Sequence, residues 1–309
     1  MDETIVPEII VPEIVVPEIV VPEIVPEIVV PEIVPEIIVP EIVFIVPYRD
    51  REAHLSIFLS HMPNILKGLK YEIYISHQKD KRFFNRGGMK NIGFVHVKEK
   101  YPDNYKDINF VFNDIDTLIS RKGLTNFKTV KGKVKHIFGF KRAFGGIFSI
   151  KGEDFENLNG FPSIWNWGME DNALKYRWLL KMKKNGDDMI DYSEFFDMKS
   201  KDIVLLWHGD KKVFNKHEAW NAYEMSGDLK DGINKIRNIQ KTENTIEDKF
   251  FMIDTTYFIP ATLPPKNAEV KEIKSIRDVH FGYDKKKEEA RKKNRHYKIR
   301  NNFSMMMKK

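Results

Sequence analysis

The sequence contains no cysteine. It can therefore form neither a disulfide bond nor a thiolate zinc site, and a reducing, cytosol-like compartment is the setting we expect. It also has no run of 18 or more apolar residues, which predicts no membrane span. The acidic start Met1-Asp2-Glu3 does not resemble the basic start of a secretory signal. These absences together predict a soluble protein in a cytoplasm, its own or that of a host cell.

Lysine and arginine are absent from residues 1–43, which carry ten acidic side chains. The whole chain has 309 residues and a net charge of +6, so the remainder, with 51 basic and 35 acidic side chains, carries +16. A field of this sign attracts anions, such as a nucleotide diphosphate, a nucleic acid or an anionic membrane. The sign alone does not choose among them.

A Pro-Glu-Ile-Val repeat fills residues 4–43, with prolines at positions 7, 12, 17, 22, 26, 31, 35 and 40. Proline at this spacing clashes with helical turns and cannot donate to a sheet ladder. We predict that residues 1–42 form an extended or disordered stalk. We place a globular domain at residues 43–235 and a C-terminal extension with a basic helix or tail at residues 236–309.

Strand-like and helix-like segments alternate after the repeat. We expect strands near residues 43–47, 71–76, 108–112, 144–150 and 203–207, and helices near residues 51–68, 85–97 and 171–184. This alternation predicts an open α/β fold with a mostly parallel sheet. Ligands of such sheets bind at the carboxyl ends of the strands.

An acidic triplet, Asp114-Ile115-Asp116, follows the apolar run Phe110-Val111-Phe112. Carboxylate oxygens suit Mg²⁺ or Mn²⁺, and such an ion can stabilise a departing diphosphate. The alternative interpretation is an ordinary turn or helix cap. The position of the triplet at a predicted strand end favours the ligand site.

Two indoles and a glycine directly precede paired carboxylates in Trp165-Asn166-Trp167-Gly168-Met169-Glu170-Asp171. Indoles stack on sugar faces, a glycine permits loop movement, and a carboxylate can take a proton from a sugar hydroxyl. His208 ends a late predicted strand, where it is either a metal ligand or a structural residue.

Two loops offer aromatic rings and guanidinium groups to a nucleotide. Pro47-Tyr48-Arg49-Asp50-Arg51 follows the first predicted strand, and Phe84-Asn85-Arg86-Gly87-Gly88 lies in a later loop. A ring can lie on a base, and arginines can bind phosphate or uracil oxygens. The first loop is equally compatible with a helix N-terminus capped by Asp50, and the second with a plain loop.

Taken in order, these motifs resemble the β-1,4-galactosyltransferase family, glycosyltransferase family 7. The resemblance covers roughly residues 43–235 and lies in Phe44 to Glu52, Phe84-Asn85-Arg86 with Asn91-Ile92-Gly93-Phe94, Phe112 to Asp116, Phe144-Gly145-Gly146, Gly160 to Asp171, His208 and Asp231-Gly232-Ile233-Asn234. It implies a GT-A fold, Rossmann-like, and an inverting transfer of a sugar from a UDP donor to a terminal sugar hydroxyl.

The resemblance also implies roles for individual residues. Asp171 would be the general base, Glu170 would orient the sugars, and Asp116 and His208 would bind Mn²⁺, with Mg²⁺ as the alternative ion. Trp167 would sit on a mobile loop that closes over the donor. The remaining donor-site residues would be Pro47, Tyr48, Arg49, Arg51, Phe84, Arg86, Asp114, Ala143 and Gly146.

Two departures from the family pattern affect the expected metal site and the expected donor pocket. Leu205 stands where many members have a methionine ligand, which implies a weaker and less selective metal site. Ala143 stands where a tyrosine often restricts the donor pocket, so UDP-GalNAc becomes a candidate donor beside UDP-Gal. The acceptor would be a glycan, with terminal GlcNAc as the family default.

An inactive sugar- or polyanion-binding module of the same fold is the alternative, suggested by Leu205 and by the charge of +16. The intact set Asp116, Glu170, Asp171 and His208 argues against it. A nucleic-acid role for the basic C-terminal tail is disfavoured, because few aromatic residues interleave its charges.

Overall fold

The computed structural model describes residues 38–166, 168–183, 187–206, 211–214, 229–262, 264 and 269–272. The chain divides into two units, residues 1–38 and 39–309. Residues 1–37 of the predicted stalk and residues 273–309 of the predicted C-terminal extension lie outside the described residues, as do Trp167 and His208. None of the helices among the described residues combines the length and the hydropathy that a bilayer span requires.

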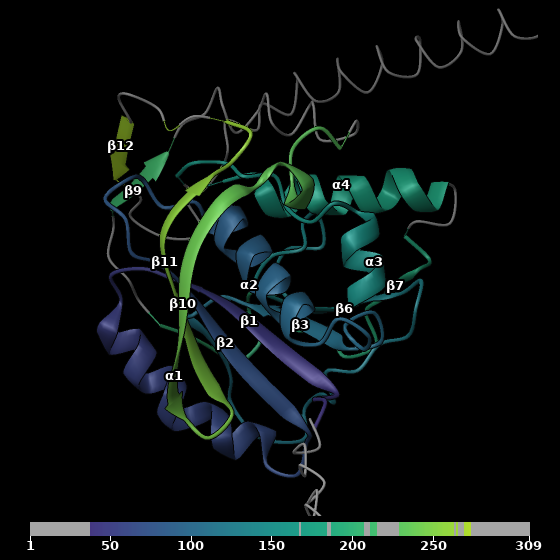
Figure 1. Cartoon of the computed structure of the whole chain (residues 1–309). Helices are drawn as coiled ribbons and strands as arrows, with labels where there is room; N and C mark the ends of the chain where they lie inside the picture. The colour runs from purple at the N-terminus through teal and green to yellow at the C-terminus, as the bar shows by residue number, and fades with distance from the viewer. Residues whose placement is uncertain are drawn as a thin grey trace, which may run out of the picture. The chain divides into compact units, whose positions relative to one another are not determined.

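A mixed eight-stranded sheet forms the centre of the second unit, in the order β10-β11-β2-β1-β3-β6-β5-β7 (Figure 1). Its strands are β1 (Ile42–Tyr48), β2 (Tyr71–Gln78), β3 (Asn109–Asn113), β5 (Val134–Phe138), β6 (Ile147–Lys151), β7 (Ile190–Asp191), β10 (Arg237–Glu247) and β11 (Phe250–Ile259). Two short ladders pair β4 (Thr117–Ile119) with β8 (Ile203–Leu205) and β9 (Lys211–Phe214) with β12 (Glu269–Glu272).

The central strands run parallel. β1 pairs in parallel with both β2 and β3, and β11 pairs in parallel with β2, whereas β6 runs antiparallel to β3 and to β5. The carboxyl ends of β1, β2 and β3 therefore meet at one edge of the sheet. The acidic triplet follows β3 at this edge, as the sequence predicts.

Helices cover both faces of the sheet (Figure 1): α1 (Glu52–Leu66), α2 (Arg86–Lys100), α3 (Gly152–Asn157) and α4 (Glu170–Met182). Every residue of β1 is buried, and alternate side chains enter two different cores because strand side chains alternate between faces. Phe44 and Val46 pack with Phe58 of α1. Val43 and Ile45 belong to the core that includes residues of α2, α3 and α4.

The predicted domain end at residue 235 has to be revised. β10 and β11 lie beyond it, yet β11 pairs with β2 from Phe250 to Thr255 and extends the same sheet. The side chain of Trp165 also donates to the Thr262 carbonyl oxygen at 2.8 Å. Residues 237–259 are therefore part of the sheet and do not form a separate extension.

Candidate active site

The candidate site lies where the start of α2, the end of β3 and the start of α4 come together. Asn85 caps α2, and its side-chain oxygen accepts from the Gly88 amide at 2.8 Å. Gly87 packs so closely on the Pro162 carbonyl oxygen that a Cβ there would lie 2.3 Å from it. The cap and this glycine hold the first turn of α2 against the chain that leads into α4.

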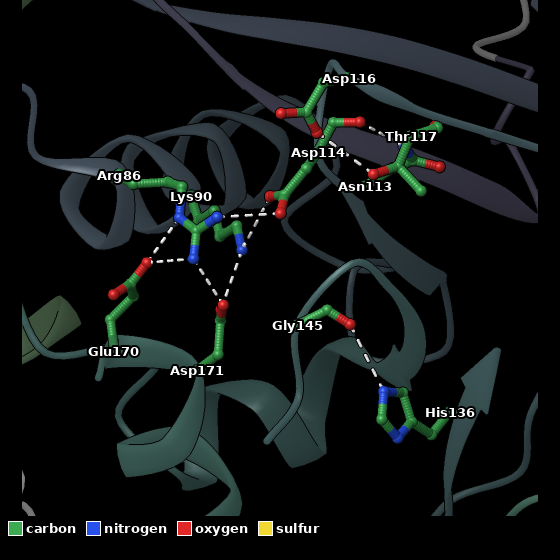
Figure 2. Close-up of polar contacts among 10 residues, drawn as sticks. All are labelled: Arg86, Lys90, Asn113, Asp114, Asp116, Thr117, His136, Gly145, Glu170 and Asp171. Atoms are coloured by element: carbon green, nitrogen blue, oxygen red, sulfur yellow. Dashed lines mark hydrogen bonds and ion pairs between the residues drawn. The ribbon is translucent and has the colours of Figure 1, made fainter. Parts of the chain in front are cut away.

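Arg86 connects three carboxylates from different parts of the fold (Figure 2). Its guanidinium donates to Asp114 at 2.9 Å, to Asp171 at 2.5 Å and to Glu170 at 2.5 Å. Burial disfavours the charge of Arg86, but the three carboxylates outweigh it and hold the pKa of the guanidinium well above its usual value. Arg86 is therefore a charged centre around which the site is built.

Lys90 is a second buried cation of the site, and the sequence analysis did not identify it. Its Nζ lies 3.1 Å from Asp171 Oδ1 and 3.4 Å from Asp114 Oδ1, and 4.7 Å from the centre of the Phe161 ring. The available signal was its spacing from Arg86, since residues four apart lie on the same face of a helix.

Asp171 is buried in the first turn of α4. Burial raises the pKa of its carboxyl to about 6, with Arg86 and Lys90 opposing the rise and Glu170 and Asp114 adding to it. The carboxylate is therefore ionised at neutral pH and still basic enough to accept a proton.

The two carboxylate oxygens of Glu170 differ in their hydrogen-bond partners. Oε1 contacts Arg86, whereas Oε2 is buried and has no hydrogen-bond partner among the described residues. Met169, which precedes it, has a positive φ of 70°, a conformation that usually favours glycine. The turn made by Gly168 and Met169 thus brings both carboxylates to the start of the helix.

The segment from Ala143 to Gly146 borders Asp171. The Phe144 amide donates to the Asp171 carbonyl oxygen at 3.0 Å, and a Cβ on Gly145 would lie 2.8 Å from Asp171 Oδ2. The Gly146 carbonyl oxygen accepts from the Asp114 amide at 3.1 Å. Ala143, the first residue of the segment, is buried. Glycine at position 145 therefore leaves the room that the Asp171 carboxylate occupies.

His136 supports this segment from below. Its Nε2 lies 3.4 Å from the Gly145 carbonyl oxygen (Figure 2). Burial lowers the pKa of His136 to about 4, so the imidazole is neutral at pH 7.

Three of the residues predicted to line a UDP site, Pro47, Tyr48 and Arg51, lie at the end of β1 or just after it. Pro47 and Tyr48 are buried, and the Tyr48 ring packs edge-on against His77 with centroids 4.9 Å apart. Arg51 is half-buried; burial lowers its pKa, and Asp116 and Asp114 oppose that effect. Arg51 therefore lies within the field of the acidic triplet.

Arg49 and Phe84 lie at the same edge of the fold. Arg49 donates to the Arg82 carbonyl oxygen and to Asp50. Phe84 is half-buried, and its carbonyl oxygen accepts from the Asn166 amide at 2.9 Å. The loop at residue 84 is thereby joined to the segment that leads into α4.

Trp165 corrects one sequence interpretation. Its indole is 1% exposed, stacks on Phe258 at 5.7 Å between ring centroids and lies 5.0 Å from the Arg82 guanidinium. It packs in the core because β11 brings Phe258 against it, so this indole is not available to a sugar face.

Asp116 lies outside the ion-pair cluster of Arg86, beside residues of β4 and the end of β8. Its Oδ1 lies 3.2 Å from the Thr117 hydroxyl, and its carbonyl oxygen accepts from the Leu206 amide at 2.8 Å. Leu205 is paired with Thr117 across the β4–β8 ladder and is exposed. Within the described residues no group of three or more His, Asp or Glu could hold a metal ion, and His208 lies outside them.

The motif Asp231-Gly232-Ile233-Asn234 binds the chain that leads to α4. Asp231 Oδ2 accepts from the Ser163 amide at 2.8 Å, and the Asn234 amide donates to Asn159 Oδ1 at 2.9 Å. Arg177 of α4, which the sequence analysis missed, donates to the carbonyl oxygens of Gly160 and Asp231, both at 2.6 Å. Residues distant in sequence therefore fix the position of this segment.

Two family models match the chain. The one described as the N-terminal region of glycosyl transferase group 7 matches residues 36–125. The one described as the N-terminal domain of galactosyltransferase matches residues 125–196. Together they cover more than half of the 309 residues.

Several characterised proteins are similar to the chain. β-1,4-Galactosyltransferase 4 of Cricetulus griseus is 31% identical over 199 residues, which cover 59% of this chain and 56% of that protein. β-1,4-Galactosyltransferase 1 of Bos taurus is 33% identical over 146 residues, which cover 43% of this chain and 35% of that protein. The chain thus spans about half the length, or less, of these relatives.

A solved structure shows the same fold. It is a Drosophila β-1,4-galactosyltransferase 7 variant in complex with manganese, UDP-Gal and xylobiose, with a TM-score of 0.52 and 22% identity. The match covers 71% of this chain and 94% of that chain. The predicted α/β GT-A fold is confirmed.

The comparisons correct the predicted location. A cytoplasmic protein was expected from the absence of cysteine and of an apolar run. That prediction is wrong, because the relatives are Golgi-type, type II membrane galactosyltransferases.

Proposed function

Because the chain belongs to glycosyl transferase group 7, we propose that it is a hexosyltransferase that moves galactose or N-acetylgalactosamine from a UDP donor to a hydroxyl of a terminal sugar, with inversion. One observation carries the proposal. A buried carboxylate, Asp171, stands at the start of α4 between two cations and opposite the carboxyl end of β3. A ligand bound at that end of the sheet would meet a base.

Asp171 is the general base of this reaction. It takes the proton of the acceptor hydroxyl as the acceptor oxygen bonds to the anomeric carbon of the donor sugar. The bond between that carbon and the diphosphate oxygen breaks, and UDP leaves with the electron pair. The pKa of about 6 leaves Asp171 ionised at neutral pH. Turnover should therefore fall as the pH drops through 6, because the protonated carboxyl cannot accept a proton.

Glu170 orients the accepting sugar. Its Oε2 is buried and has no hydrogen-bond partner among the described residues, while its Oε1 is held by Arg86. A sugar hydroxyl that donates to Oε2 would satisfy this atom, whose burial without a partner costs about 1–3 kcal/mol.

Asp116 and His208 are the proposed ligands of Mn²⁺. A carboxylate with an imidazole suits Mn²⁺ better than Mg²⁺, which prefers oxygen alone. The amide of Leu206, two residues before His208, donates to the Asp116 carbonyl oxygen, which supports the pairing. The bound ion would supply charge stabilisation to the leaving diphosphate.

Ala143 sets the size of the donor pocket in this proposal. The residue is buried and precedes Phe144, whose amide binds the Asp171 carbonyl oxygen. A methyl group takes less space than a phenol ring, which favours a donor with an N-acetyl group. UDP-GalNAc and UDP-Gal are therefore both candidate donors.

The test uses the full-length protein with UDP-Gal and UDP-GalNAc, each with Mn²⁺, Mg²⁺ or EDTA, and with free GlcNAc as acceptor. We expect metal-dependent UDP release and a transferred sugar. Ala143→Tyr should lower kcat/KM for UDP-GalNAc relative to UDP-Gal by about tenfold or more. An equal effect on both donors would refute the role of Ala143. Absence of both UDP binding and UDP release would favour the inactive binding module.

A further inference from the structure

Lys90 is a buried lysine to which the proposed reaction assigns no task. It lies one turn after Arg86 on α2 and is 1% exposed. Its Nζ approaches Asp171 Oδ1 at 3.1 Å and Asp114 Oδ1 at 3.4 Å (Figure 2). A charged lysine is costly to bury unless carboxylates compensate for the lost water.

The charges around Asp171 explain why a second cation is needed. Arg86 and Lys90 face it from α2, Glu170 lies beside it on α4, and Asp114 faces it from the end of β3. Two cations therefore form ion pairs with three carboxylates. Without Lys90, Arg86 alone would face all three, and a buried carboxylate in that position takes up a proton more easily.

The two oxygens of Asp171 are held separately. Arg86 Nη2 donates to Oδ2, and Lys90 Nζ donates to Oδ1. A Cβ at position 145 would meet Oδ2 at 2.8 Å, so the carboxylate is closely packed on that side as well. Lys90 thus fixes the oxygen that Arg86 does not hold.

We propose that Lys90 is a positioning residue that keeps Asp171 ionised and fixes the orientation of its carboxylate toward the acceptor hydroxyl. The proposal rests on the proposed function, because it presumes that Asp171 acts as the base. The causes of the Asp171 pKa agree with the proposal. Burial raises this pKa, and Arg86 and Lys90 oppose the rise. Loss of either cation should therefore raise the pKa further.

The first test is the pH profile of kcat/KM in the full-length protein with Lys90→Met. The acidic limb should move up by about one pH unit or more, since a cation within about 4–6 Å lowers a carboxyl pKa by about 1–3 units. Activity at pH 6.5 should fall about threefold for a shift of one unit, and more for a larger shift, and should recover in part at higher pH. Lys90→Arg, which keeps the charge, should restore the wild-type limb.

Lys98→Met is the matched control. Lys98 lies on the same helix, is partly exposed and pairs with Glu156. This variant loses the same charge from α2 and should leave the limb in place. A uniform loss of activity in Lys90→Met, with the limb unmoved, would overturn the proposal.

The closing experiment does not require turnover. Aspartate labelled with ¹³C at the side-chain carboxyl is incorporated, and the Asp171 resonance is the one lost in Asp171→Asn. Its titration midpoint should rise in Lys90→Met, or in Lys90→Gln if the first variant does not fold, and should stay unchanged in Lys98→Met. An unmoved midpoint refutes the role of Lys90. A raised midpoint in a protein that transfers no sugar refutes only the proposed function.

Discussion

Asp114 and Asp116 are two residues apart, yet they lie in different electrostatic surroundings. The carboxylate of Asp114 forms ion pairs with Arg86 and Lys90, inside a cluster that also holds Glu170 and Asp171. Asp116 lies beside the Thr117 hydroxyl (Figure 2), and its carbonyl oxygen accepts from Leu206, next to the β4–β8 ladder. One carboxylate is thus part of a built-in charge network, and the other lies next to a short, partly exposed ladder.

The difference suggests a division of labour within one short loop. The side with Asp114 is pre-organised, because its cations come from α2 and need no ligand. The side with Asp116 would be completed by the metal ion and the diphosphate. Preorganised charge is most effective where charge develops during the reaction. The following variants test this division, beginning with the largest expected effect.

Asp171→Asn should remove the base and spare the rest of the site. We expect turnover to fall by about 10²–10⁴-fold, the usual contribution of a positioned general base. Folding should persist, since two cations then face two carboxylates. Initial-rate measurements at pH 7.5 provide the test.

Asp187→Asn serves as the control, because its side chain is 74% exposed and pairs with Lys175, outside the Arg86 network. It should behave as wild type. Wild-type turnover in Asp171→Asn would mean that another group accepts the proton.

Arg86→Met should be the most destabilising change in the network. It leaves the buried Glu170 and Asp171 and the half-buried Asp114 with Lys90 alone, and should cost about 3–5 kcal/mol of unfolding free energy at pH 7. The cost should shrink as the pH falls, because protonation removes the uncompensated charge. Urea unfolding at pH 7 and pH 5 measures both quantities.

The surface pair Arg121–Asp202 offers the contrast, with an arginine side chain that is 70% exposed. Arg121→Met should cost less than about 1 kcal/mol at either pH. If the two arginines gave equal losses, the claim of a pre-organised network would be wrong.

Leu205→Met should have the smallest effect and act only on the metal side. Leu205 is exposed on β8 opposite Thr117. A thioether there should tighten Mn²⁺ binding by up to about tenfold, or about 1.4 kcal/mol. Calorimetric titration with Mn²⁺ in the presence of UDP reports the change.

Val204→Met is the paired variant. Val204 is the preceding residue of the same strand, so its side chain points to the opposite face. No tightening is expected from it. Equal tightening in both variants would exclude a specific ligand position at Leu205.

Local patterns predicted much of the fold and part of the site. The run Val43-Phe44-Ile45-Val46 gave a buried strand because its side chains enter both cores. The acidic triplet was found because it directly follows a strand. The Glu170-Asp171 pair was found because it opens a helix.

Long-range packing decided the rest. Lys90 has a role only because α2 lies against the start of α4, and no local sequence pattern predicts that contact. Trp165 looked like a sugar platform until β11 placed Phe258 against it. β10 was missed because its side chains are mostly exposed and polar, without the alternation that marks a half-buried strand.

The most direct test of the division between the two sides is UDP binding, measured by calorimetry with Mn²⁺ or EDTA in the wild type, Asp116→Asn and Asp171→Asn. The account predicts that Asp171→Asn retains the Mn²⁺-dependent part of UDP binding although its turnover is lost, and that Asp116→Asn loses that part. Wild-type Mn²⁺ dependence in Asp116→Asn, or its loss in Asp171→Asn, would contradict the account.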